Sequence, residues 1–429
     1  MKSVHLTNAW HSASGGIGTF YRALMAAADA HEHYMRLIVP ADETRIEEVS
    51  PFVRIYHLRA PRAPLNRSYR WLLPERYLRP RSDIRRILYD ERPDLIEICD
   101  KYTLQYLAGL VRRNWFFPDG HRPTLVGLSC ERMTDNLLVY LPRFPFAESF
   151  CRLYMKWLYF PLFDHHITVS RFTADELRGA SRGHVVRRGV WVRGMGVDTA
   201  GFSPARRDPL LRRRLLALSG GETGSVLLLY AGRLAPEKNL DMLVQVMRLL
   251  GRVPEFDFRL VIAGDGMLRQ ALERDVALSC PGRVAFLGHF GTRDELAAIY
   301  ASADAFVHPN PAEPFGIAPL EAMASGLPLV ACNRGGVISY AAPSCAWLAD
   351  PDPRSFVEAI CALARCRAER QARVRAALET ARRYAWPNIA GGYLRLYREI
   401  HEWHSGACPN PRIQPDFIST AGNWLGLEV

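Results

Sequence analysis

Short apolar runs alternate with helical patterns along the first half of the chain. The runs that we predict as strands are residues 4–8, 35–40, 53–58, 94–99, 124–129 and 167–170. Each is rich in β-branched or other apolar side chains, and each is followed by a segment with helical spacing. Such alternation is typical of a parallel sheet wound with helices.

A second series of the same kind begins near residue 226. Its predicted strands are residues 226–230, 259–263, 284–287, 305–308, 329–332 and 346–348. Residues 201–224 are rich in arginine, proline and glycine, so we predict a linker there between domains 1–200 and 225–385. A break at Tyr384-Ala385-Trp386-Pro387 precedes a last helix over 386–403. We assign no role to the tail, residues 404–429.

The fold class is therefore α/β, with two Rossmann-like, doubly wound domains. Sheets of this kind bind ligands outside the carboxyl ends of their strands, so two of them are expected to face a shared cleft. A length of 429 residues fits two domains. The 48% hydrophobic and 23% charged residues exclude a disordered chain and a membrane bundle.

The sequence predicts neither a transmembrane segment nor a secreted, disulfide-bonded protein. The most apolar region, residues 137–163, is interrupted by four charged residues and three prolines, and no signal-peptide pattern opens the chain. Nine scattered cysteines without a C-x-x-C pair indicate reduced thiols, not a zinc cluster or a disulfide framework. We expect a cytoplasmic protein, peripheral on the inner face of the membrane.

The net charge of +11 is concentrated in one stretch of the first domain, residues 59–86. Only Glu75 and Asp83 oppose its arginines, which are Arg59, Arg62, Arg67, Arg70, Arg76, Arg79, Arg81, Arg85 and Arg86. A second segment, 140–160, is rich in aromatic residues. Arginines and aromatics together suit an anionic membrane surface, and they would suit nucleic acid too. A solvated charged loop beside a core helix is the simpler alternative.

The segment with most chemical content runs from Glu313 to Pro328. The strand that ends at His308-Pro309 leads into a helix whose first N–H groups, at Gly316 and Ile317, are free to bind an anion or a hydroxyl. Glu313 and Glu321 can accept hydrogen bonds from a polyhydroxylated ligand, and we expect Glu321 to lie deeper. A solvated loop carboxylate and a helix-surface carboxylate are the alternatives.

This E-x7-E segment, with its continuation F-G-I-A-P-L-E-A-M-A-S-G-L-P, closely resembles family 4 of the retaining glycosyltransferases, the glycosyl transferases group 1 with the GT-B fold. The resemblance implies that Glu313 touches the donor sugar and that Glu321 holds the nucleotide ribose. The N–H groups of Phe315, Gly316 and Ile317 would bind sugar hydroxyls or the diphosphate. The resemblance extends along the chain from Gly15 to the last helix, which in such enzymes crosses back onto the first domain.

A second feature is Gly232-Arg233-Leu234-Ala235-Pro236-Glu237-Lys238-Asn239, directly after the first strand of the second domain. An arginine and a lysine at this turn supply positive charge where a leaving diphosphate develops negative charge. By itself the pair could also be ordinary surface residues. The resemblance implies that Arg233 and Lys238 are the diphosphate clamp, so no metal and no cofactor besides the donor are expected. Asp350-Pro351-Asp352 follows the last strand, away from the clamp.

A third feature is the glycine-rich turn from Ser12 to Gly18 after the first strand. The resemblance implies that Gly15 and Gly16 reach the donor phosphates, and that the loop beginning at Leu287 lies near the nucleobase. The turn lacks the G-x-G-x-x-G spacing of dinucleotide sites, which counts against an oxidoreductase.

The chain departs from the family pattern at one position. Family members that read S-H-E-R place the histidine at the reaction centre, whereas this chain reads Ser129-Cys130-Glu131-Arg132. A thiol is a weaker hydrogen-bonding group than imidazole, so either Glu131 substitutes for the histidine or the activity is altered. Cys130 could also be a small apolar filler.

The predicted function is retaining transfer of a hexose-type sugar from a GDP- or UDP-linked donor to a hydroxyl acceptor. We expect a lipid-linked or glycoconjugate acceptor at a membrane surface, with 59–86 and 140–160 as the contact, and no nucleic acid partner. The alternative is a homologue that binds a nucleotide sugar or a lipid headgroup without transfer.

Overall fold

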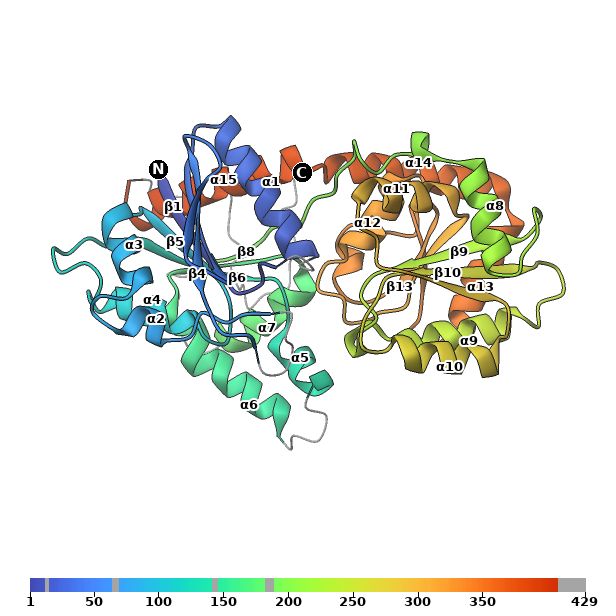
Figure 1. Cartoon of the computed structure of the whole chain (residues 1–429), viewed down its shortest axis with the longest axis horizontal. Coiled ribbons are helices and arrows are strands. Elements are labelled where there is room, and N and C mark those ends of the chain that lie inside the picture. The colour runs from blue at the N-terminus through green and yellow to red at the C-terminus, as the bar shows by residue number, and fades with distance from the viewer. Residues whose placement is uncertain (12–14, 64–68, 141–145, 182–188, 408–429) are drawn as a thin grey trace, which may run out of the picture. The chain divides into compact units, whose positions relative to one another are not determined.

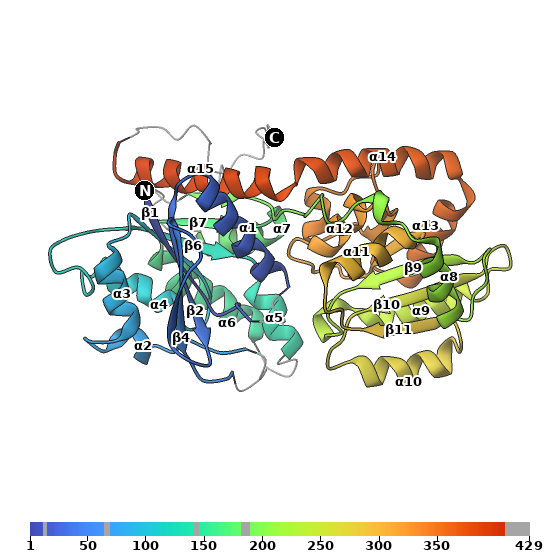
Figure 2. The ribbon, with the colours of Figure 1, turned by 45° about the horizontal axis from the view of Figure 1, so that its top comes forward.

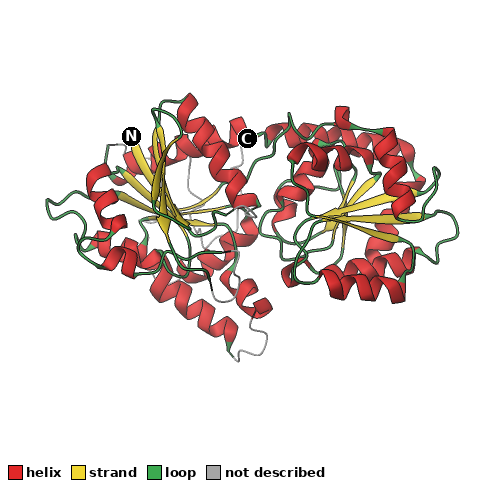
Figure 3. Cartoon of the chain, in the orientation of Figure 1, coloured by secondary structure: helices red, strands yellow, loops and turns green. Residues whose placement is uncertain are grey.

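The computed structural model describes residues 1–11, 15–63, 69–140, 146–181 and 189–407. The chain divides into two compact units. The first holds residues 1–138, 143–194 and 387 onward, and the second holds 139–142 and 195–386. Each unit is a sheet between layers of helices (Figure 3).

The first unit is built on an eight-stranded sheet with the order β3-β4-β2-β1-β5-β6-β7-β8. All neighbours are parallel except β3, which pairs antiparallel with β4. The central strands β1 and β6 are buried on both faces, as their apolar runs require. The strands are β1 Lys2–Thr7, β2 Tyr34–Ala41, β3 Arg45–Glu48, β4 Val53–Arg59, β5 Leu95–Cys99, β6 Thr124–Ser129, β7 His165–Thr168 and β8 Val190–Val192.

Helices cover both faces of this sheet (Figure 1). On one face, α1 packs beside the last helix, α15, with the rings of Phe20 and Tyr393 4.9 Å apart. The opposite face is covered by α3, α4 and α7. The helical segments are α1 Gly16–Ala30, α2 Glu75–Leu78, α3 Asp83–Glu91, α4 Gln105–Arg112, α5 Met133–Tyr140, α6 Ala147–Tyr154, the π-helical η1 Met155–Tyr159, the 3-10 turn η2 Phe160–Leu162, α7 Arg171–Ser181 and α15 Trp386–His404.

The helix α15 lies in the first unit although it is the last helix of the chain. The Tyr393 hydroxyl donates to the Arg193 carbonyl at 2.6 Å, and the Tyr397 hydroxyl donates to the buried carboxylate of Glu97 in β5. These contacts tie the end of the described chain to the first sheet.

The second unit contains a six-stranded parallel sheet with the order β11-β10-β9-β12-β13-β14. Figure 2 shows α11, α12 and α14 on one side of this sheet and α10 on the other, and in Figure 1 α8 lies on the side of α11 and α9 on the side of α10. The strands are β9 Val226–Ala231, β10 Phe258–Ala263, β11 Val284–Gly288, β12 Ala305–His308, β13 Leu329–Cys332 and β14 Trp347–Ala349. The helical segments are η3 Pro204–Arg206, α8 Pro209–Leu218, η4 Pro236–Lys238, α9 Leu240–Leu250, α10 Arg269–Ser279, α11 Arg293–Ser302, α12 Ile317–Ala324, η5 Gly336–Ser339, α13 Pro353–Arg365 and α14 Arg367–Arg383.

The prediction of two doubly wound α/β domains is confirmed, and three predicted strands, 124–129, 305–308 and 329–332, have the predicted bounds. The predicted strand 167–170 is wrong by two residues. The observed strand is β7, His165–Thr168, and it begins with the two buried histidines His165 and His166. The predicted linker 201–224 contains α8, which Asp208 caps and which buries Leu215 and Leu216. The chain passes from the first unit into the main part of the second earlier than predicted, between residues 194 and 195.

Across the described ranges, no helix is long and apolar enough to cross a membrane. The eight cysteines that lie in these ranges are free thiols.

Candidate active site

Glu313 lies at the carboxyl edge of the second sheet, in the loop between β12 and α12. Its Oε2 is 2.8 Å from Lys238 Nζ, 3.0 Å from Asn310 Nδ2 and 3.3 Å from His308 Nε2. The residue is only 9% exposed. The alternative of a solvated loop carboxylate is therefore wrong.

These partners determine the charge of Glu313. Burial alone would raise the pKa of this carboxyl group, but the Lys238 ammonium and the neighbouring His308 ring lower it well below its usual range. Glu313 is consequently an ionised acceptor beside a cation.

The backbone that follows Glu313 turns sharply into α12. Gly316 has φ +89°, and a Cβ there would lie 3.0 Å from Val337 Cγ2 and 3.1 Å from the Tyr340 hydroxyl oxygen. The Tyr340 hydroxyl donates to the Gly316 carbonyl. Glycine is thus required at the position that opens α12, whose first N–H groups have no acceptor within the helix. The binding of ligand hydroxyls or phosphates by Phe315, Gly316 and Ile317 remains a prediction.

Glu321 lies one turn into α12 and is as buried as Glu313. Its exposed fraction is 8%, against 9% for Glu313, so exposure does not distinguish the two and the greater depth of Glu321 stays a prediction. Its carboxylate is 3.0 Å from Arg293 Nη2 and 3.4 Å from the Tyr300 hydroxyl oxygen. Burial raises the pKa of Glu321 to about 7, although Arg293 opposes the rise. A helix-surface carboxylate is excluded.

Arg233 and Lys238 follow β9 and have acidic neighbours. The Arg233 side chain is half exposed, with Nη2 3.1 Å from Glu237 Oε1. Lys238 is largely buried against Glu313. The turn between them is fixed because the Leu234 N–H donates to the Asp265 carbonyl at 3.0 Å. Their role as a diphosphate clamp remains a prediction.

The other predicted donor-binding residues lie at strand or helix ends. Leu287 is half-buried near the end of the edge strand β11. Gly15 and Gly16 are exposed at the start of α1. Residues 12–14 of the glycine-rich turn lie outside the described residues.

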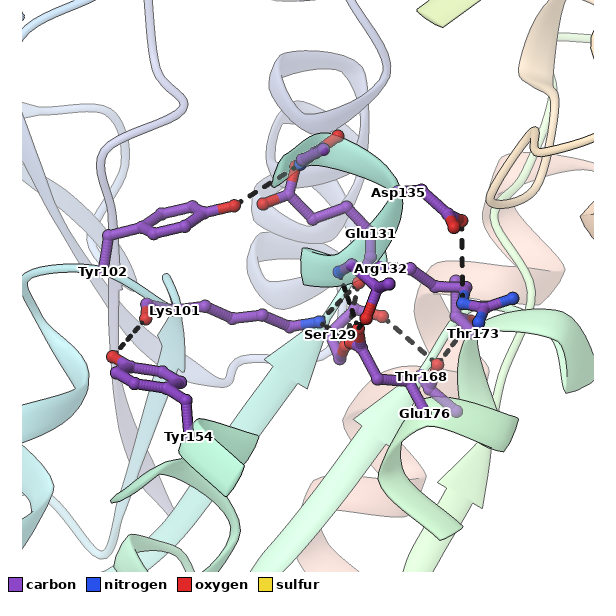
Figure 4. A network of polar contacts seen from close by, with 12 residues as sticks. Lys101, Tyr102, Ser129, Glu131, Arg132, Asp135, Tyr154, Thr168, Thr173 and Glu176 are labelled. Carbon is purple, nitrogen blue, oxygen red and sulfur yellow. Dashed lines mark hydrogen bonds and ion pairs between the residues drawn. The ribbon is translucent and has the colours of Figure 1, made fainter. Parts of the chain in front are cut away.

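Cys130 and Glu131 follow β6 in the first unit. Figure 4 shows the surroundings of Glu131. The Cys130 Sγ is 3.9 Å from Cys99 Sγ, and this hydrogen bond together with burial raises the pKa of Cys130. Burial also raises the pKa of Glu131, and this rise is larger than the opposing effect of the Lys101 ammonium. The pair therefore presents a neutral thiol and a weakly acidic carboxyl group.

Side chains that the sequence analysis missed complete these surroundings. They are His308 and Asn310 at Glu313, Arg293 and Tyr300 at Glu321, and Lys101 and Glu176 at Glu131. The position of Lys101, two residues after the end of β5, was a usable signal. No local spacing relates Arg293 to Glu321, because 28 positions separate them in sequence.

The two aspartates of the D-P-D sequence have structural roles. Asp352 caps α13 by accepting from the N–H groups of Arg354 and Ser355, and Asp350 accepts from Asn333 at 2.7 Å. In the part of the chain that the structure describes, no group of three or more His, Cys, Asp or Glu could hold a metal ion.

The aromatic segment 140–160 divides into two faces. Tyr154, Tyr159 and Phe160 are buried, so their predicted contribution to a membrane-facing surface is wrong. The exposed apolar side chains are Phe146, Phe150, Leu153, Trp157 and Leu158. In the basic stretch, Tyr77 is buried as well, and five arginines are exposed, namely Arg59, Arg62, Arg79, Arg81 and Arg86. Arg67 and Phe144 lie outside the described residues.

Comparisons with known proteins agree with this architecture. Residues 14–200 match the family described as "Glycosyltransferase Family 4", and residues 225–366 match "Glycosyl transferases group 1". The chain is 30% identical over 396 residues to a GDP-mannose-dependent alpha-(1-6)-phosphatidylinositol dimannoside mannosyltransferase of Mycobacterium tuberculosis, covering 92% of this chain and 95% of that protein. It is 33% identical over 209 residues to the sulfoquinovosyl transferase SQD2 of Arabidopsis thaliana, covering 46% of this chain and 36% of that protein.

Solved structures share the fold at lower identity. Sucrose-phosphate synthase from Thermosynechococcus elongatus superposes with a TM-score of 0.68 at 20% identity, covering 93% of this chain and 99% of that chain. WaaG, a glycosyltransferase involved in lipopolysaccharide biosynthesis, superposes with a TM-score of 0.64 at 14% identity, covering 92% and 99%.

Proposed function

Because the chain belongs to the family 4 glycosyltransferases and has the GT-B fold, we propose that it transfers a hexose from a nucleotide-diphosphate sugar to a hydroxyl group, with retention at the anomeric carbon. GDP-mannose is the first donor to test, because the mycobacterial relative that matches over 95% of its length is described as GDP-mannose-dependent. A lipid-linked hydroxyl is the proposed acceptor.

The observation that carries this proposal is the environment of Glu313. An ionised, buried carboxylate contacts Lys238 at 2.8 Å and precedes a helix whose first N–H groups lack intrahelical acceptors. This combination offers an acceptor for sugar hydroxyls and donors for a diphosphate within one loop. Glu321 would accept hydrogen bonds from the ribose hydroxyls.

In the proposed reaction, the sugar–phosphate bond breaks as the acceptor oxygen approaches the same face of the sugar. The donor phosphate takes the acceptor proton, and the leaving diphosphate gains negative charge that Arg233 and Lys238 stabilise. Glu237 and Glu313, which pair with these cations in the structure, would share them with the diphosphate. The two cations supply the charge that a metal ion supplies elsewhere, so we propose that no metal and no cofactor are needed.

A ligand panel with a product assay tests the proposal. Thermal shifts with GDP, UDP and their sugars identify the base, since a ligand at 100 times its dissociation constant stabilises the fold by about 2.7 kcal/mol. The anomeric coupling of the transferred sugar in the NMR spectrum reports retention. An inverted product would contradict the retaining mechanism. Loss of transfer in chelator, restored by a divalent ion, would contradict metal independence.

We further propose that α6 and η1 contact the cytoplasmic side of an anionic membrane and that the enzyme binds its acceptor there. Phe146, Phe150, Leu153 and Trp157 are 45% to 83% exposed, and their spacing of three or four residues places them on one side of the helical segment. The exposed guanidinium of Arg152 accompanies them. Apolar side chains flanked by basic groups favour an anionic interface.

Vesicle sedimentation tests this contact. Vesicles with anionic phosphatidylinositol or phosphatidylglycerol should bind the protein, binding should fall with salt, and Phe150→Ser with Trp157→Ser should weaken it. Equal binding to neutral and anionic vesicles would reject the electrostatic part.

A second candidate function rests on Cys130. Because its thiol accepts a hydrogen bond from Cys99 and its pKa is raised, the chain could bind a nucleotide sugar or a lipid headgroup without transferring anything. Donor binding without transfer to any hydroxyl acceptor, and without donor hydrolysis, would favour this alternative.

A further inference from the structure

Lys101 and Glu176 form a buried ion pair in the first unit that no predicted role uses. Lys101 follows β5 and its side chain is 2% exposed, while Glu176 belongs to α7 and its side chain is 6% exposed. Their charged atoms, Nζ and Oε2, are 2.7 Å apart. Removing two charges from water is costly, so the contacts that this pair makes indicate what it is for.

Each member of the pair also holds the backbone of the segment after β6 (Figure 4). The Lys101 ammonium donates to the main-chain carbonyl of Glu131. The other oxygen of Glu176 accepts from the Thr134 N–H at 3.1 Å and from the Thr134 hydroxyl at 3.3 Å. The pair therefore hydrogen-bonds the Glu131 carbonyl, just before α5, and the Thr134 N–H, in the first turn of α5.

Two further contacts hold the same region. The Thr168 hydroxyl at the end of β7 donates to the Ser129 carbonyl at 3.2 Å, which anchors the segment at its start. The Tyr154 hydroxyl in α6 donates to the Lys101 carbonyl at 2.7 Å, which anchors the lysine itself. Residues 129–134 are thus fixed at three backbone positions, and the side chains of Cys130 and Glu131 lie within this fixed stretch.

The electrostatics of the pair agree with a supporting role. Burial alone would raise the pKa of Glu176, but Lys101 and the N–H groups at the start of α5 lower it, so this carboxylate is ionised. The Lys101 ammonium bonds the main chain of Glu131, while the carboxyl group of Glu131 has side-chain contacts of its own with Asn136 and Tyr102.

We propose that Lys101 and Glu176 are positioning residues for sugar transfer, which hold the segment 129–134 so that Cys130 and Glu131 face the reacting groups. This inference rests on the proposed function. Neither residue contacts the substrate in the proposal, so removing the pair should change turnover more than donor affinity. A displacement of reacting groups by about 1 Å can cost 10²-fold in rate.

The chain offers a matched control for a purely structural ion pair. Glu91 is also 6% exposed, and it pairs with Arg36 at 2.8 Å and with Lys2 at 2.9 Å. Lys2 begins β1, so this cluster lies at the amino edge of the same sheet, opposite the segment 129–134. Glu91→Gln and Glu176→Gln therefore remove the same charge at equal burial.

The experiment compares both variants in transfer kinetics and in amide hydrogen exchange of the folded protein. Glu176→Gln should lower turnover at saturating substrates by 10- to 100-fold, leave the donor KM within about twofold, and raise the exchange rate of the Thr134 amide at least tenfold. Glu91→Gln should leave turnover and that amide within about twofold, even if both variants lower the thermal midpoint equally. The double variant Lys101→Met with Glu176→Gln leaves no unpaired charge, so it should fold and still lose turnover.

The outcomes separate the two proposals. Equal turnover in Glu176→Gln and Glu91→Gln, or unchanged exchange at Thr134 in Glu176→Gln, would overturn the positioning role. A wild-type protein that transfers no sugar would instead remove the proposed function, while the exchange comparison would still decide whether the pair holds the segment.

Discussion

The carboxyl edges of the two sheets each combine a lysine with a glutamate, and they use the lysine in different ways. In the second unit, Lys238 pairs with the side chain of Glu313 and lowers its pKa. In the first unit, Lys101 donates to the main chain of Glu131 and pairs with Glu176, and the pKa of the Glu131 carboxyl group is raised.

This difference shows that a lysine beside a glutamate does not by itself decide the charge of the carboxyl group. Lys238 outweighs the burial of Glu313 and lowers its pKa, whereas the burial of Glu131 outweighs the effect of Lys101 and raises its pKa. The four predictions below test this contrast, from the largest expected effect to the smallest.

Removing Lys238 should have the largest effect. Lys238→Ala, and likewise Arg233→Ala, should lower turnover at least ~100-fold, because each deletes a preorganised charge at the leaving diphosphate. Single-turnover kinetics with saturating donor measures the loss. Arg259→Ala, at the amino edge of the same sheet, removes a cation paired with Asp257 at 2.8 Å and should leave the rate unchanged. Near-native turnover in Lys238→Ala or in Arg233→Ala would contradict the proposed role of these residues as the diphosphate clamp.

Glu131 should affect turnover without affecting donor binding. If its carboxyl group replaces the family histidine, Glu131→Ala should lower turnover about 100-fold while the donor dissociation constant stays within twofold. Glu131→Gln keeps a hydrogen-bond donor and should retain part of the rate. Calorimetric donor binding alongside the transfer assay separates the two effects, and a loss of affinity in Glu131→Ala would place this residue at the donor instead.

Glu321 should make donor affinity depend on pH near neutrality. Burial raises its pKa to about 7, so the carboxylate that we propose as the acceptor of the ribose hydroxyls becomes protonated below that pH. Donor affinity should therefore fall as the pH decreases below 7, approaching about tenfold per unit. Titration calorimetry from pH 5 to 8 measures the slope. Glu321→Gln should bind weakly at every pH without this slope, and Glu313→Gln should keep it, because the pKa of Glu313 lies far below the range.

Cys130 should give the smallest change, and in the opposite direction. Cys130→His restores an imidazole where the family pattern has one and should raise transfer a few-fold, with Cys130→Ser as the control of similar size. A change below about twofold in both, equivalent to ~0.4 kcal/mol in the barrier, would make position 130 structural.

The sequence determined the features that depend on neighbours in the chain. Strand positions followed from apolar runs, and the places of Glu313, Gly316, Arg233 and Lys238 followed from motifs at strand ends. Gly316 illustrates the reason, since a sharp turn into a helix requires a residue that tolerates φ +89° wherever the rest of the chain lies. Such local requirements are visible in the sequence alone.

Only the tertiary structure decided which charged groups meet. Lys238 and Glu313 are 75 positions apart, and they meet because β9 and β12 pair side by side and deliver their following loops to one edge. Lys101, Glu131 and Glu176 meet for the same reason, because they follow the adjacent strands β5, β6 and β7. Strand order is fixed by packing over the whole sheet, so the equal burial of Glu313 and Glu321, and their opposite pKa shifts, could not be derived from spacing along the chain.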